Sequence, residues 1–159
     1  MISPRSHRPA KRCRRRSSDD GASAVEFALV SVLLFTILFG LIQYGLYFWS
    51  LQSGSSAARE GARRAAVGDL GCTDLEAYVK ARVQGETDAG DIATRTYHQA
   101  DGTTAASPAV VGGVVTVTVT FNSIDLGFPF VPFIDDGLVS EEAFSRVENV
   151  DPAMSVDCS

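Results

Sequence analysis

The sequence lacks the short motifs by which many enzymes are recognised. It contains no glycine-rich phosphate-binding loop, no HExxH zinc motif and no candidate catalytic serine with a histidine nearby. Its two histidines and three cysteines show no spacing that fits a metal site, and His98 stands alone in a predicted strand. The pairs Asp135-Asp136 and Glu141-Glu142 are typical of solvated surface acids rather than of a general acid/base dyad. We therefore expect neither catalysis nor a bound metal or cofactor.

Charge is also missing from a long stretch, because Glu26 is the only charged residue between Ala22 and Ala58. From Phe27 to Trp49 there are twenty-three consecutive uncharged residues, most of them large and apolar. A bilayer core is crossed by about 20 helical residues, whereas the apolar core of a removable secretory signal has only about 7–15. The run therefore predicts a transmembrane helix at about 27–49, with an aromatic cluster at the outer interface: Tyr44, Tyr47, Phe48 and Trp49.

The charges that are present divide the chain into a basic tail and an acidic body. The first twenty residues hold seven of the fourteen Lys and Arg, and after Gly21 seven basic residues face seventeen acidic ones. Clustered arginine can bind nucleic acid, but a Pro/Ser/Arg-rich tail supplies no folded basic surface for it. Placed just before an apolar helix, such a cluster holds its side of the membrane in the cytoplasm. We expect an N-terminus inside, an acidic head outside and no nucleic-acid partner.

Glu26 needs an explanation, because acids within membrane segments are candidates for function. It is either a hydrated interfacial residue without a role, or the partner of a cation on another transmembrane helix, or part of a processing motif. In the third interpretation Gly21 precedes a cleaved bond, Ala22 becomes the N-terminus and Glu26 is the fifth mature residue. The new amine then pairs with the carboxylate of a neighbouring subunit, since a matched pair is tolerated where two lone ions are not. This interpretation accounts for the most features.

The same residues carry a family resemblance. A basic leader, a glycine, four small or apolar residues, Glu26-Phe27 and an uninterrupted apolar helix resemble a type IV pilin-class prepilin. More narrowly, "GASAVEFALVSVLLFTILFGLIQYGLYF" and "SAAREGARRAAV" resemble TadE-like proteins, minor pilins or pseudopilins of bacterial tight-adherence (Tad, Flp-type) pili. The resemblance extends more loosely to "VVTVTVTFNSIDLGFPFVPF" and "LVSEEAFSRVE". It implies cleavage after Gly21 by a prepilin peptidase, whose own acids are the catalytic ones.

The resemblance also implies where the protein acts and with what. It implies a structural role in pilus assembly, with links to adhesion and secretion, in the inner membrane or in the extracellular pilus. The implied partners are the prepilin peptidase, other pilin or pseudopilin subunits, the Tad inner-membrane assembly proteins and the membrane. The alternative is a single-pass signal-anchored protein with an extracytoplasmic binding or scaffold head. A third interpretation, the major pilin, is disfavoured because major Flp-type subunits are much shorter.

The chain after the apolar helix predicts a small α+β head. We expect a leader at 1–21, a long helix at 22–67 that ends near Gly68 and Gly71, and a head at 72–159. "TDLEAYVKARV" matches a capping box at Thr73-x-x-Glu76 and predicts an amphipathic helix at 74–84. Valine alternates with threonine in "VVTVTVTF", which predicts a strand with one buried face. "DIATRTYHQ" and "LVSEEAFSRVE" are its expected neighbours, giving an antiparallel sheet of about three strands.

Two further features of the head concern its aromatic loop and its cysteines. The segment 127–133, "GFPFVPF", is stiffened by two prolines, and we expect its phenylalanines to cover the core rather than form an exposed contact patch. Cys13 belongs to the leader, whereas Cys72 and Cys158 both lie in the outer part, where a disulfide can form. Such a bridge closes a loop of more than eighty residues and contributes about 4 kcal/mol in the chain-entropy model. Two free thiols are the alternative.

Overall fold

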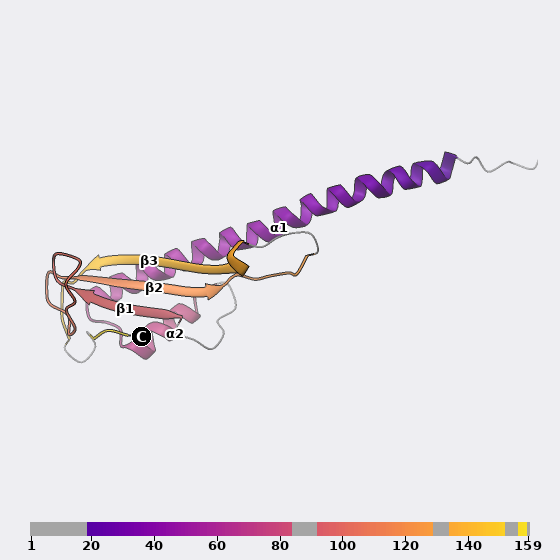
Figure 1. Ribbon diagram of the computed structural model, residues 1–159. Coiled ribbons are helices and arrows are strands. Elements are labelled where there is room, and N and C mark those ends of the chain that lie inside the picture. Colours follow the sequence, from indigo (N-terminus) through magenta and orange to yellow (C-terminus); the bar gives the residue numbers. More distant parts are fainter. Residues whose placement is uncertain (1–18, 84–91, 129–133, 152–155, 159) are drawn as a thin grey trace, which may run out of the picture. The chain divides into compact units, whose positions relative to one another are not determined.

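The computed structural model describes residues 19–83, 92–128, 134–151 and 156–158 (Figure 1). A helix, α1 (Asp19–Ala66), is followed by a short helix, α2 (Cys72–Lys80). Three strands, β1 (Ala93–His98), β2 (Val114–Asn122) and β3 (Leu138–Arg146), form an antiparallel sheet in the order β1-β2-β3, and a 3-10 turn (Ile134–Gly137) precedes β3. This confirms the predicted α+β fold with a long apolar N-terminal helix, one short helix and three strands.

The chain divides into two compact units, residues 1–37 and 38–159. In the first unit the large apolar side chains of α1 are exposed, with 61–74% of the surface of Val25, Phe27 and Leu29 accessible. Ser31 and Thr36 donate their hydroxyl protons to the backbone carbonyls of Ala28 and Val32, so neither hydroxyl needs water. A helix that is apolar all round is stable in lipid or among other helices rather than in water.

The second unit is built around one face of the sheet. Along β2 the valines are buried and the threonines partly exposed, as the alternating sequence predicts. Val117 of β2 lies opposite Arg95 of β1 and Ala143 of β3, so the same face continues across all three strands. The C-terminal half of α1 joins this core mainly through small side chains: Ala57, Ala58, Ala62, Ala65 and Ala66.

Two glycines allow α1 to lie close to the sheet. A Cβ atom at Gly54 would stand 2.9 Å from Cε1 of Phe121, and one at Gly61 would stand 3.2 Å from Leu75 and 3.4 Å from Val117. Atoms this close repel each other, so larger residues would push the helix away from β2 or from α2. The small residues therefore set the distance between helix and sheet.

The end of α1 has the glycine-terminated geometry that the sequence predicts. Gly68 adopts a φ of 73°, and the amides of Gly68 and Asp69 bond to the carbonyls of Ala65 and Arg64, which is a Schellman motif. The chain that leaves β3 completes the cap, because the amide of Glu148 donates to the carbonyl of Ala66 over 2.8 Å. Helix and sheet are thus joined where both end.

The start of α2 differs from the prediction. The helix begins at Cys72 with Gly71 as its N-cap, and no side chain caps it, so the predicted capping box at Thr73 is wrong. Thr73 lies inside the first turn because the helix starts earlier than expected, at the residue that carries the disulfide. The predicted apolar face is correct, since Leu75 and Val79 are buried. The expected C-terminal end at residue 84 is wrong, because the helix ends at Lys80 with Ala81 as its C-cap.

One member of the predicted membrane-interface belt belongs instead to the head. Tyr47 is only 8% exposed and is part of the core, whereas Phe48 and Trp49 are 63% and 59% exposed. The aromatic cluster therefore has two sides, one turned into the protein and one turned away from it.

Candidate functional site

The residues predicted to act in processing and assembly lie together at the start of α1. Gly21, Ala22, Glu26 and Phe27 are all helical and all exposed. Ala22 and Glu26 are four residues apart, so they lie on the same face one turn from each other. Among the described residues none forms an ion pair with Glu26. The site is therefore an exposed carboxylate at the edge of an apolar helical surface.

Gly21 is the third residue of α1, and apart from the helix's own backbone none of the described residues lies within 4 Å of a Cβ atom placed there. A protease generally needs an extended backbone, so cleavage after Gly21 requires the first turn of the helix to unwind. Glycine lowers the cost of unwinding, because it is about 1 kcal/mol less favourable than alanine inside a helix. The bond after Gly21 lies between two exposed residues in the first turn of the helix, where helices fray.

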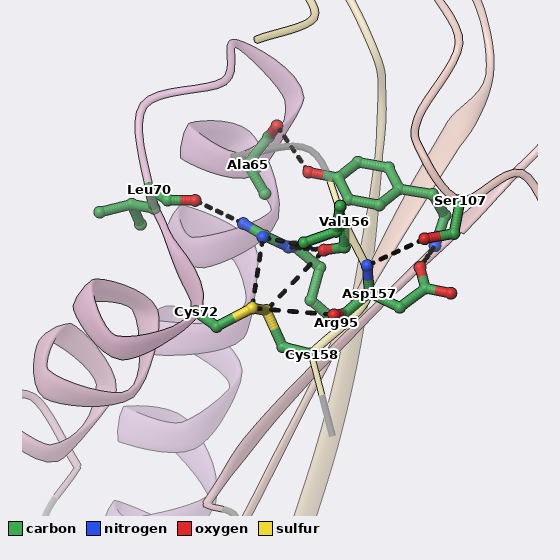
Figure 2. The surroundings of a disulfide bond; sticks show 9 residues. Ala65, Leu70, Cys72, Arg95, Ser107, Val156, Asp157 and Cys158 are labelled. Atoms are coloured by element: carbon green, nitrogen blue, oxygen red, sulfur yellow. Dashed lines mark hydrogen bonds between the residues drawn. A yellow bond between two sulfur atoms is a disulfide. The ribbon is translucent and has the colours of Figure 1, made fainter. Parts of the chain in front are cut away.

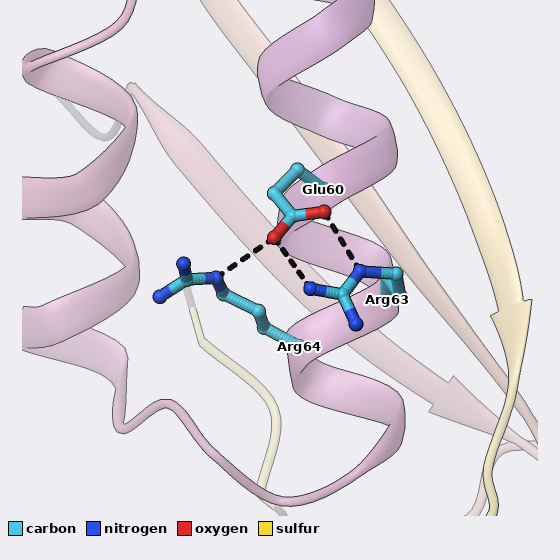
Figure 3. A network of polar contacts seen from close by, with 3 residues as sticks. All are labelled: Glu60, Arg63 and Arg64. Carbon is cyan, nitrogen blue, oxygen red and sulfur yellow. Dashed lines mark hydrogen bonds and ion pairs between the residues drawn. The ribbon is translucent and has the colours of Figure 1, made fainter.

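A second glutamate of the same helix shows what a fully paired acid looks like. Glu60 accepts two hydrogen bonds from Arg63, at 2.8 and 2.7 Å, and a third from Nε of Arg64 at 3.0 Å (Figure 3). The hydrogen bonds from Arg63 and then Arg64 lower the pKa of Glu60 to about 2. Arg64 also lies 4.6 Å from the ring centre of Tyr78, so this network links α1 to α2.

The two outer cysteines are joined in the structure. A disulfide connects Cys72, the first residue of α2, to Cys158, with 5.5 Å between their Cα atoms (Figure 2). The backbone of Cys158 exchanges two hydrogen bonds with that of Arg95, at 3.0 and 2.8 Å. The carboxylate of Asp157 accepts a bond from the amide of Tyr97. The C-terminal segment is thus fixed to β1 by its backbone and to α2 by a covalent bond.

Arg95 fills the space beside this disulfide and was not predicted as a site residue. It is fully buried and donates to the carbonyl of Leu70 at 2.6 Å and to that of Val156 at 2.9 and 3.2 Å (Figure 2). Burial lowers the pKa of the Arg95 guanidinium. The signal was present in the sequence, because period-two alternation places Arg95 on the same strand face as Ala93 and Tyr97.

Gln43 is the second residue that the sequence interpretation missed. It lies inside the predicted transmembrane segment, yet it is only 2% exposed. Its amide nitrogen donates to the carbonyl of Ile124 at 2.9 Å, and its oxygen accepts from the amide of Leu126 at 3.1 Å. One turn earlier, Phe39 stacks on Phe128 with 4.5 Å between ring centres. The rest of the aromatic loop that was expected to cover the core, residues 129–133, lies outside the described residues.

No group of three His, Cys, Asp or Glu side chains within the described ranges is arranged to hold a metal ion. The geometry instead offers two kinds of surface: an exposed apolar helix with one acid, and a small disulfide-bonded head. By length and composition, α1 is able to cross a membrane between Gly21 and Ala66. These features together fit a membrane-anchored α+β protein with an apolar N-terminal helix.

Comparison with known families is consistent with this class. Residues 21–63 match the family model of TadE-like protein, which confirms the predicted resemblance over that segment. The matched segment contains Gly21, Glu26, Glu60 and Arg63, but neither Arg64 nor any of the sheet. No curated protein and no solved structure matches the chain. The TadE-like segment and the apolar helix fit a pilus-related, membrane-anchored protein.

Proposed function

We propose that the protein is a structural subunit of a Tad (Flp-type) pilus, a minor pilin or pseudopilin that a prepilin peptidase cleaves after Gly21. In this proposal the mature chain begins at Ala22, remains in the inner membrane with its head outside, and enters the pilus through α1. It is an assembly component and the substrate of the peptidase, with no catalytic role of its own. Other pilin subunits and the Tad inner-membrane proteins are its partners.

The observation that carries the proposal is Glu26, an exposed carboxylate without an ion-pair partner among the described residues, inside a TadE-like segment. The large apolar residues around it are exposed too, so this surface needs lipid or other helices to cover it. Cleavage after Gly21 would create a positive α-amine one helical turn from Glu26. Within one subunit the two lie on the same face, and between staggered subunits they supply complementary charges.

This arrangement gives Glu26 the role of setting the register between neighbouring helices. A buried ion pair is tolerated only when both partners are in place, and removal of one partner costs about 3–5 kcal/mol. A helix displaced along its neighbour would leave both ions unpaired in an apolar surrounding. Only one stagger therefore satisfies the pair, and the same stagger repeats from subunit to subunit.

A second candidate function, a single-pass anchor with an extracytoplasmic binding or scaffold head, is favoured by the head itself. The head shares one core with the C-terminal half of α1 and is closed by a disulfide, all within one chain. In that case Glu26 is an interfacial residue and its substitution has little effect.

The variants Glu26→Gln and Glu26→Ala separate the two functions. We expect both variants to insert into the membrane and be cleaved, but to reach the sheared pilus fraction at about a tenth of the wild-type level or less, because a lone amine is left in an apolar interface. The measurement is quantitative immunoblotting of membrane and pilus fractions from cells with an active prepilin peptidase.

Glu142→Gln is the matched control, since Glu142 is an exposed acid on β3 and its substitution removes the same charge from the chain. It should assemble like the wild type. Wild-type incorporation of both Glu26 variants would contradict the pairing role. Absence of the wild-type protein itself from the pilus fraction would support the anchor. Loss of the Glu142 variant as well would show that assembly responds to total charge.

A further inference from the structure

The segment that leaves β2 runs back along α1 towards the membrane-spanning part of the helix. Ser123 bonds to Ser50 through the two hydroxyl groups, over 3.1 Å. Ile124 and Leu126 then bond to Gln43, and Phe128 stacks on Phe39. From residue 50 to residue 39 the segment follows eleven residues of helix, which correspond to about 16 Å. We name residues 123–128 the return segment.

The return segment presents both apolar side chains and a charge. The side chains of Ile124 and Leu126 are 38% and 44% exposed. Between them lies Asp125, which is also exposed and accepts a hydrogen bond from the amide of Gly127. An exposed carboxylate together with irregular backbone is excluded from the hydrocarbon of a bilayer, because lipid offers no hydrogen bonds. Apolar side chains beside it are well placed at the boundary between lipid and water.

The depth of the return segment depends on which residue of α1 begins the hydrocarbon core. If the hydrocarbon extended from Phe27 to Trp49, as the charge-free run alone suggests, Gln43 and the return segment beside it would lie about 9 Å below the outer boundary. If it begins at Ala22 instead, a core of about 30 Å ends close to Ile42. The second placement leaves Asp125 in water and brings Leu126 to the boundary.

We propose that the return segment is a membrane contact that rests on the outer surface of the bilayer, with Leu126 and Ile124 against the lipid and the hydrocarbon ending near residue 42. Gln43 is its positioning residue, because it satisfies one carbonyl and one amide of the segment. The segment contains Asp125 and no basic residue, so apolar contact rather than attraction to anionic headgroups holds it. This inference requires that α1 spans a membrane and that the Glu26 carboxylate, about 6 Å inside the inner boundary, is paired or hydrated there. It does not require a role in pili.

The proposal changes the expected depth of two other residues. Glu26 would lie about 6 Å inside the inner boundary, since it is four residues beyond Ala22. Trp49 would lie about 10 Å outside the outer boundary, seven residues beyond Ile42. Trp49 is the only tryptophan in the sequence and is 59% exposed, so the unmodified protein already reports on the outer boundary.

Tryptophan fluorescence in phosphatidylcholine vesicles tests the proposal on the full chain. Leu126→Trp and Ile124→Trp would each be placed in a Trp49→Phe background, with Val111→Trp as the control. Val111 is 68% exposed and precedes β2, so it lies at the other end of that strand from the return segment. The lipids would carry bromine either near the headgroup end of the acyl chains or near their tips, and acrylamide would report access to water. Mobility on non-reducing gels would show that the disulfide has formed.

We expect shallow bromine to quench the tryptophan at 126 or 124 at least twofold more than deep bromine does. Neither lipid should quench the tryptophan at 111 or the natural Trp49, and acrylamide should quench both. Equal results with added anionic lipid would support apolar contact. Stronger quenching at 126 by deep bromine, strong lipid quenching of Trp49, or no lipid quenching at 126 and 124 would each overturn the proposal, the last indicating that the segment faces water or a protein.

Discussion

The two ends of α1 belong to one helix but differ in the size and burial of their apolar side chains. Up to Leu38 the helix is rich in Leu, Val and Phe, and these large side chains are exposed. From Ala57 onwards the inward positions are alanines and glycines, packed against β2 and α2. Large exposed apolar residues suit contact with lipid or with other helices, whereas small buried residues suit close packing against a fixed part of the same protein.

The acids of the two regions differ in the same way. Glu60 has two arginine partners within one turn of its own helix, and Glu26 has no ion-pair partner among the described residues. A residue whose partners are in the same chain contributes to folding. A residue whose partner must come from elsewhere is suited to contribute to assembly, which is why we assign that role to the N-terminal region.

The largest expected effect comes from removing the disulfide, which lies in the head. The double variant Cys72→Ser/Cys158→Ser should lower the free energy of unfolding of the head by about 2–5 kcal/mol, since the bridge closes a long loop. Denaturant unfolding followed by near-ultraviolet circular dichroism measures this. Membrane insertion of α1 should not change.

Cys13→Ser is the matched control, because Cys13 belongs to the predicted leader rather than to the head and its substitution should leave the head's stability unaltered. A double variant as stable as the wild type would show that the backbone bonds between Arg95 and Cys158 suffice to hold the C-terminal segment.

A smaller effect is expected from filling the close contact between helix and sheet. Gly54→Leu should destabilise the head by about 1–3 kcal/mol, because its Cβ would stand 2.9 Å from Phe121. Gly45→Leu places the same residue on the same helix where nothing lies within 4 Å, and it should be neutral or slightly stabilising. Unfolding midpoints of the two variants give the comparison directly, and equal midpoints would mean that the helix is not held at this distance.

The smallest effect concerns the Glu60 network, which is partly exposed and therefore screened by salt. The pKa of Glu60 is lowered to about 2 from an ordinary 4.5, so its contribution to stability is complete above about pH 4.5 and disappears as the pH falls through about 2. The difference in unfolding midpoint between the wild type and the Glu60→Gln variant should therefore be constant above about pH 4.5 and disappear as the pH falls through about 2.

Glu148→Gln, at an exposed acid beyond β3, is the control for loss of one charge and should show no comparable pH dependence. A midpoint difference for Glu60→Gln that stays constant down to pH 2 would show that the two arginines do not stabilise the carboxylate.

Much of the fold follows from local pattern. The Val/Thr alternation of β2 gives the strand and its buried face, and Gly68 marks the end of α1 because its positive φ suits glycine. The capping box at Thr73 failed because the helix begins at a cysteine fixed by a distant partner. No local pattern contains that information.

Among the candidate site residues, only those that lie close together in the sequence could be proposed from the sequence. Gly21, Ala22 and Glu26 lie within one short segment, so their spacing carries the hypothesis. Gln43 and Arg95 bond to backbone groups 25 to 83 residues away along the chain, in Leu70, Val156 and Leu126. Such partners are found only when the chain is folded.

The central claim is that the chain is a processed pilin-class subunit, and the most direct test is its N-terminal sequence and intact mass after purification from its native membrane. The account predicts an N-terminus that begins Ala22-Ser23-Ala24 and a mass that lacks residues 1–21. An N-terminus at Met1 or Ile2, in cells with an active prepilin peptidase, would contradict it.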